Sequence, residues 1–247
     1  MTDWHPPRTV AHRDATLSFA VRLTDRFTGD RPEGTRFAVD PVDVDPVTNR
    51  SGYHVFLDLD ADAVTLTVDG GDRYVDERRR VLLAPDVDPD DAPGTGDTDG
   101  GTDESEETPP THVVTDPGDP LEIDLCPTPA YGFPSSTTTV RGHVEDADGD
   151  PVAGATVALE EFDPVVETTG TGEFALWVPV SAEHVVRREG RNVVVVDSLA
   201  SDGGTALADG DGTDPTLVVS HPERGGTSEG LEVAAGTRTV HYVTLEG

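Results

Sequence analysis

The sequence contains no lysine, one cysteine and few aromatic residues. Its 17 basic residues are therefore all arginines, and they face 49 acidic residues, which gives a formal net charge of −32. The longest basic run is Arg78, Arg79 and Arg80, too short for a phosphate-binding patch, so the sequence disfavours nucleic acid and anionic membranes as partners. The single Cys126 excludes an internal disulfide and is expected to be a buried structural thiol.

Long apolar runs are also missing. Residues 1–7 contain no apolar segment typical of a secretory signal, and no stretch approaches eighteen apolar residues. The sequence thus predicts no membrane span and a cytoplasmic protein. Trp4 lies in this polar N-terminal arm, where it is either an anchor for a partner protein or an incidental residue of a loose terminus.

The acidic residues are spread over segments with a strand pattern as well as over loops, which favours a folded domain with an acidic surface. Such a composition resembles proteins of salt-in halophiles, and we expect a halophilic archaeon as the source. Molar salt shortens the Debye length to roughly 3 Å, so repulsion among the carboxylates is screened there.

Alternation of apolar and polar residues dominates the chain, and helical spacing is absent. The clearest alternating runs, with period two, are Leu17 to Leu23, Val64 to Val68, Leu121 to Leu125 and Thr239 to Leu245; Phe37 with Val39 and Val81 to Leu83 indicate further strands. In residues 52–57 the alternation puts Tyr53, Val55 and Leu57 on one face. Turn-forming glycine, aspartate and proline separate these runs, so the sequence predicts an all-β protein.

Residues 139–179 contain the most specific pattern. A strand with Val140, Gly142 and Val144 leads to the turn DADGDP at 146–151, a second strand at 154–159, a turn at 169–172, and a strand with Phe174, Leu176 and Val178 that has Trp177 on its opposite face. The order strand, D-G-x-P-V-x-G-A-x-V, strand, T-x-x-x-G-x-F, strand resembles the carboxypeptidase regulatory-like domain. That resemblance implies a small immunoglobulin-like or transthyretin-like β-sandwich, and it implies nothing specific about activity.

The predicted organisation is two immunoglobulin-like or transthyretin-like β-sandwiches in tandem. We expect an N-terminal arm at 1–13, a first sandwich at 14–126 with a flexible acidic loop at 86–110, a connector rich in proline and aromatic residues at 127–135, and the carboxypeptidase regulatory-like sandwich at 136–247. The loop residues lack apolar side chains whose burial would offset their ordering entropy.

Motifs for chemistry are poor. Asp146, Asp148 and Asp150 imitate the start of a calcium loop, but the twelfth position is Val157 and the flanks are strands, so a solvated turn is favoured. The eight histidines form no H-E-x-x-H motif, Glu183–His184 is interpreted as a loop, and no G-x-S-x-G is present. We expect no enzyme, no cofactor and no metal site.

Three further motifs bear on function. F-x-V-R-L-x-D-x-F-T-G at 19–29, S-G-Y-H-V-F-L-D-L at 51–59 and P-x-P-A-Y-x-F-P at 127–134 are similar to accessory proteins of phage-tail-like contractile injection systems. Gly132 stands where the connector of those proteins has a proline. The resemblance implies a structural adaptor near a cap, sheath or baseplate, with other protein subunits of a larger assembly as partners.

Two alternatives stay open: a cell-surface or carbohydrate-binding module, and an enzyme or its regulatory subunit, for which no residue constellation is present. Under the adaptor hypothesis, aromatic and arginine side chains are the expected interface anchors. These are Trp4, Arg78, Arg79, Arg80, Tyr131 and Phe133. For Tyr131 and Phe133, packing between the protein's own two domains is an equally favoured interpretation.

Overall fold

The computed structural model describes residues 15–83, 109–196 and 212–246, and in these ranges nearly all regular structure is β-strand. A short 3₁₀ turn, η2 (Ala182–His184), lies between β12 and β13. The predicted all-β fold is confirmed. Most of the predicted acidic loop at 86–110, and the arm at 1–13, lie outside the described residues. The chain forms two compact units, described separately below.

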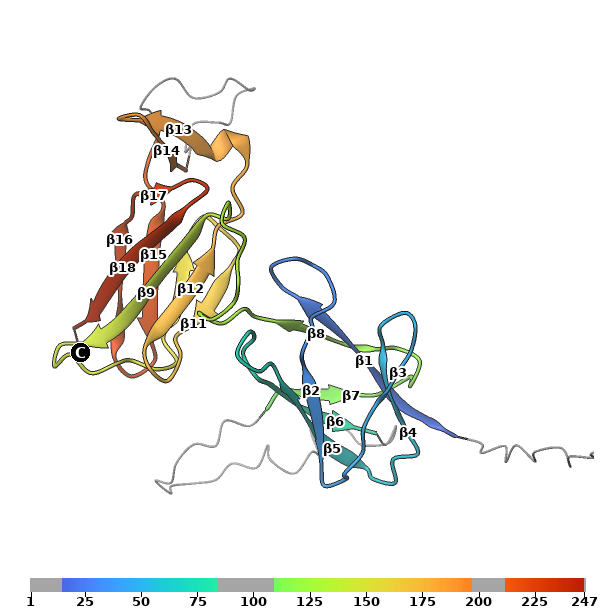
Figure 1. Cartoon of the computed structure of the whole chain (residues 1–247). Helices are drawn as coiled ribbons and strands as arrows, with labels where there is room; N and C mark the ends of the chain where they lie inside the picture. Colours follow the sequence, from blue (N-terminus) through green and yellow to red (C-terminus); the bar gives the residue numbers. More distant parts are fainter. Residues whose placement is uncertain (1–14, 84–108, 197–211, 247) are drawn as a thin grey trace, which may run out of the picture. The chain divides into compact units, whose positions relative to one another are not determined.

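Unit 1 comprises residues 1–25, 29–71 and 76–125. Two four-stranded sheets form its β-sandwich (Figure 1), one with the order β3-β4-β1-β8 and the other with the order β2-β5-β6-β7. Their bounds are β1 (Leu17–Asp25), β2 (Arg36–Asp40), β3 (Val47–Thr48), β4 (His54–Leu57), β5 (Ala63–Asp69), β6 (Glu77–Leu82), β7 (Thr111–Val113) and β8 (Leu121–Leu125). The pairs β1–β8 and β6–β7 are parallel, and the others are antiparallel.

The core of unit 1 follows the alternation of its strands. Phe19, Val21 and Leu23 of β1 are buried, and β5 buries Val64, Leu66 and Val68. Strand β4 alternates as predicted, and the face that it buries carries His54 and Phe56, whereas Val55 and Leu57 on the other face are half-buried. The reason is packing, because the ring of Phe56 stacks on that of Phe19 with centroids 4.5 Å apart.

Unit 2 comprises residues 26–28, 72–75 and 126–247. Its sheets have the orders β11-β10-β15-β16, β12-β9-β18 and β13-β14-β17 (Figure 1). The bounds are β9 (Thr139–Asp146), β10 (Thr156–Leu159), β11 (Val165–Glu167), β12 (Glu173–Trp177), β13 (Val185–Arg188), β14 (Arg191–Val194), β15 (Thr216–His221), β16 (Gly225–Gly230), β17 (Val233–Ala234) and β18 (Arg238–Leu245). One continuous core, which includes Val140, Val144, Val157, Leu217 and Val243, lies between the first two sheets.

Two glycines of the regulatory-like pattern are required by close approaches of other atoms. A Cβ on Gly142 of β9 would lie 1.9 Å from the His241 carbonyl oxygen and 2.7 Å from the Phe174 ring. Gly172 has φ +76°, and a Cβ there would lie 2.5 Å from the Val144 carbonyl oxygen. Strands β12 and β18 can flank β9 this closely because Gly142 carries no side chain.

Candidate interaction surface

The predicted contact residues fall in three places. Trp4 lies outside the described residues. Arg78, Arg79 and Arg80 lie on β6 in unit 1, and Tyr131 and Phe133 lie together in unit 2.

The three consecutive arginines of β6 do not make one patch. Successive side chains of a strand point to opposite faces, so Arg79 is directed away from the face of Arg78 and Arg80. Arg79 forms an ion pair with Glu77, two positions earlier on the same face, at 2.7 Å. Arg78 is exposed, and Arg79 and Arg80 are half-buried. The three arginines are consecutive in the sequence, but the strand places them on two opposite faces.

Tyr131 and Phe133 belong to an aromatic cluster on unit 2. Their ring centroids are 4.7 Å apart, and the ring of Phe27 packs edge-on against both, at 5.8 Å and 5.0 Å. Tyr74 contacts Tyr131 at 5.7 Å, and Trp177 contacts Phe27 at 6.1 Å. Tyr131 is 4% exposed. Trp177, whose side chain lies on the outer face of β12, is 7% exposed because the cluster covers it.

Hydrogen bonds to main-chain carbonyl oxygens hold the short segments that supply Phe27 and Tyr74 within unit 2. Arg26 donates to the Val165 carbonyl oxygen at 3.2 Å. The Val75 N–H donates to the Cys126 carbonyl, and the Thr128 N–H donates to the Arg73 carbonyl. Cys126 itself is half-buried against the core of unit 2.

Arg141 of β9 clamps the connector onto the sheet. Its guanidinium donates to the carbonyl oxygens of Pro129 at 2.7 Å and Tyr131 at 3.1 Å, and it lies 5.5 Å from the centre of the Phe133 ring. Its buried Nε has no hydrogen-bond partner within the described part of the chain. Burial, and secondarily the charge of Arg238, lower the pKa of Arg141. Arg141 and Arg238 are thus near enough for their charges to interact, and neither forms an ion pair with another described residue.

A hollow of about 280 Å³ lies beside this clamp, lined by Phe133, Pro134, Ser135, Thr137, Thr139, Arg141 and Arg238. Strand β18 continues the surface from there. Arg238, Val240 and Tyr242 alternate along its outward face, and Val240 pairs in register with Arg141 of β9. Val240 is 55% exposed and Tyr242 is 72% exposed. We call Arg141, Arg238, Val240 and Tyr242 the β18 face.

Strand β18 is also an edge strand of its sheet, which has the order β12-β9-β18 (Figure 1). The inward-facing His241 of β18 bonds Glu229 of β16 at 2.7 Å. This side-chain contact links β18 to β16, which is the edge strand of the neighbouring sheet. The β18 face combines an exposed valine with a tyrosine and two arginines, and tyrosine and arginine are residue types enriched at the centres of protein interfaces.

The calcium-loop-like motif at 146–150 and the pair Glu183–His184 both form local hydrogen bonds that stabilise a turn. Asp146 accepts hydrogen bonds from the N–H groups of Asp148 and Asp150 and forms an ion pair with Arg224, and these contacts, led by that of Asp150, lower its pKa. Residues 146–150 therefore form a turn closed by its own carboxylate. Glu183 and His184 both bond the Ser181 hydroxyl, at 2.9 Å, at the start of η2. Within residues 15–83, 109–196 and 212–246, no group of three potential metal ligands occurs, and no helix is long and apolar enough to cross a membrane.

Sequence reasoning missed Phe27, Arg141, Arg238, Val240 and Tyr242. A signal was present for Tyr242, since it alternates with the core residues Val243 and Leu245. None was present for Phe27, because its neighbours in the cluster lie more than a hundred residues away in the sequence.

Comparisons with known proteins identify no family. No family model matches the sequence, and no curated protein matches it. Among solved structures, the chain is similar to the Bacillus anthracis TIE protein, with 10% identity and a TM-score of 0.28 over 94% of this chain and 34% of that one. A streptococcal ancillary pilin gives 12% identity and a TM-score of 0.24 over 94% of this chain and 62% of the pilin. The chain thus spans less than two thirds of the length of either protein, and similarity at this level does not bear on function.

Proposed function

We propose that the protein is a non-catalytic structural adaptor in a larger protein assembly, and that this assembly is a phage-tail-like contractile injection system. The observation that carries the proposal is the β18 face, an exposed strip of tyrosine, valine and arginine on an edge strand of an otherwise acidic protein. A strip of this composition is suited to hold a neighbouring subunit.

The two arginines of the β18 face indicate that the neighbouring subunit presents acidic side chains. Arg238 forms no ion pair within the described residues, and the Arg141 guanidinium bonds only main-chain carbonyls there. Carboxylates of a partner would complement both arginines, in bidentate geometry where they are accessible. At the salt concentrations of a salt-in halophile, unspecific attraction is screened, so close contacts with Tyr242 and Val240 would supply most of the affinity.

The aromatic cluster supports the role of a rigid adaptor. Contacts of Tyr131, Phe133 and the Arg141 guanidinium attach the connector at 127–135 to the sheet that contains β9 and β12. This connector is also one of the three motifs that resemble accessory proteins of contractile injection systems, and that resemblance supports the finer part of the proposal. A preorganised surface loses less conformational entropy on docking.

The test is affinity purification of the tagged protein from its native cells in molar salt, followed by mass spectrometry and negative-stain microscopy. We expect sheath, tube and baseplate subunits together with rod-shaped particles. The double variant Val240→Ser, Tyr242→Ser should lose these partners while its unfolding midpoint stays unchanged. The control variant Val165→Ser removes another exposed valine of unit 2, 39% exposed, and should keep them. A monodisperse protein without partners contradicts the proposal.

A further inference from the structure

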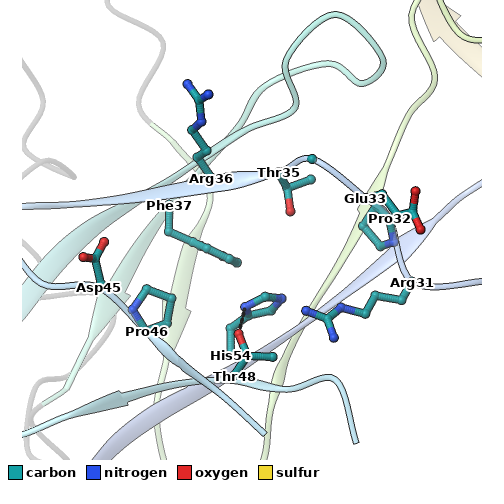
Figure 2. A pocket seen from close by; sticks show the side chains of 11 residues that line it. Arg31, Pro32, Glu33, Thr35, Arg36, Phe37, Asp45, Pro46, Thr48 and His54 are labelled. Carbon is teal, nitrogen blue, oxygen red and sulfur yellow. Dashed lines mark hydrogen bonds between the residues drawn. The ribbon is translucent and has the colours of Figure 1, made fainter. Parts of the chain in front are cut away.

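Unit 1 contains a groove of about 740 Å³ that lies between two unpaired sheet edges. Strand β2 is the edge of one sheet and β3 is the edge of the other, and residues from both strands line the groove. Figure 2 shows the side chains of Arg31, Phe37, Thr48 and His54 converging in it. This groove is separate from the β18 face, which lies in unit 2.

The floor of the groove is largely uncharged. The Phe37 ring packs on the His54 ring with centroids 4.5 Å apart and on the buried Phe56 ring at 5.8 Å. The Thr48 hydroxyl bonds His54 Nδ1 at 3.2 Å. Burial, and secondarily the charge of Arg31, lower the pKa of His54 and so favour the neutral imidazole. Beside this floor, Val47 of β3 is 58% exposed.

Arg31 is the positive charge directed at the floor of the groove, which is also lined by Glu33, Arg36 and Asp45. Its guanidinium points toward His54 and Thr48, whereas the side chain of Arg36 points away from the groove (Figure 2). Arg31 forms no ion pair within the described residues, although the chain has 49 acidic residues for 17 arginines. An exposed arginine directed toward this floor is complementary to a carboxylate that comes from outside.

The two strand edges determine the shape of the occupant. The outer edge of β2 presents main-chain N–H and C=O groups that no described strand pairs, contributed by alternate residues of this five-residue strand. An extended peptide satisfies such groups by joining the sheet as an additional strand. Alternate side chains of that strand would then point into the groove, against Phe37 and Pro46.

We propose that this groove binds an extended segment of a partner protein, which adds as a strand to β2, places an aliphatic side chain on Phe37 and pairs a carboxylate with Arg31. The strand supplies the main-chain hydrogen bonds, and the groove selects its side chains. Unit 1 would thereby hold a second subunit of the assembly independently of the β18 face.

The experiment starts by panning a library of random nonapeptides displayed on beads against the full chain, in molar potassium chloride. We expect enriched peptides to alternate aliphatic residues with polar ones and to carry Asp or Glu at a constant position. Binding of a synthetic enriched peptide is then measured by fluorescence anisotropy. Arg31→Gln should weaken binding roughly tenfold, as expected for the loss of a charge-assisted hydrogen bond. Arg78→Gln, which removes an exposed arginine of β6 that does not line the groove, is the control and should leave binding unchanged.

Hydrogen exchange distinguishes strand addition from other occupants. The bound peptide should slow exchange of the unpaired β2 amides, whereas a ligand held by side chains alone would leave them unprotected. The proposal is overturned if no peptide is enriched, if Arg31→Gln binds as well as the native chain, or if β2 amides stay unprotected. A glycan array that finds a sugar bound at Phe37, or self-association through β2, overturns it as well. None of these outcomes changes the result expected for the Val240→Ser, Tyr242→Ser variant. The groove proposal and the β18-face proposal can therefore be refuted independently.

Discussion

The two units bury their aromatic residues in different places. In unit 1, Phe19 and Phe56 stack inside the sandwich, between the two sheets that the unit's own strands provide. In unit 2, the sandwich core is mainly aliphatic, and Phe27, Tyr74, Tyr131, Phe133 and Trp177 gather on the outer face of one sheet.

This difference separates two uses of aromatic burial. The rings inside unit 1 stabilise the fold itself, because removing one leaves a cavity between sheets. The rings on unit 2 fix segments that are remote in sequence onto the sandwich, and Phe27 and Phe133 pack against its core from one side. Substitutions in the first group should therefore act on global stability, and those in the second on the connector and the surface next to it.

The largest effect is expected from Phe56→Ala. The truncation opens a cavity beside Phe19 and should destabilise unit 1 by about 3–5 kcal/mol. Urea unfolding followed by circular dichroism should show an earlier transition for unit 1. In a Trp4→Phe background, the fluorescence of Trp177 reports on unit 2 and should keep its midpoint. A shift of both transitions together would show that the two cores do not unfold independently.

A smaller effect is expected from Arg141→Met. The methionine keeps much of the apolar contact with Phe133 but leaves the Pro129 and Tyr131 carbonyl oxygens without their donor. We expect a loss of about 1–3 kcal/mol in unit 2, measured by urea unfolding with Trp177 fluorescence. The neighbouring Arg238→Met removes an equal charge without such bonds and should change stability by less than about 0.5 kcal/mol. Equal losses of stability in the two variants would contradict a stabilising role for the Arg141 hydrogen bonds.

The smallest effect is the pH dependence contributed by His54. Because its pKa is lower in the folded protein than the ordinary 6.5, the unfolded chain binds more protons between these two values. The stability of unit 1 should therefore decrease as the pH falls from 6.5 to the lowered pKa, with a slope of at most about 1.4 kcal/mol per pH unit from this one group. The unfolding midpoint of His54→Gln should vary less with pH over that range. An unchanged slope in the variant would assign the dependence to other groups.

Local alternation was enough to predict most of the fold. Runs such as Val64 to Val68 and Leu121 to Leu125 form strands with the expected inward side chains, since one buried face requires period two. Strand β16 was missed because Gly225 to Gly230 has no apolar side chain, and it forms by pairing with β15. Alternation also could not decide which face of β4 is buried, because Phe56 and Val55 are both apolar and the stacking partner Phe19 decides it.

The interaction surfaces could be predicted only in part. Tyr131 and Phe133 stood out in the connector, but the arginine that holds them lies on β9, and Phe27 and Tyr74 come from distant segments. The groove of unit 1 depends on two strand edges that belong to different sheets, and no local pattern carries that information.

In both units the first strand pairs in parallel with the last, β1 with β8 and β9 with β18. During translation, β9 can pair with β18 only after Arg238, the partner of Thr139, has been synthesised 99 residues later (238 minus 139). At about 5–20 residues per second the wait is roughly 5–20 s, during which one side of β9 has no partner. Neither sheet can close until its unit is almost fully translated, so synthesis time limits how early each unit folds.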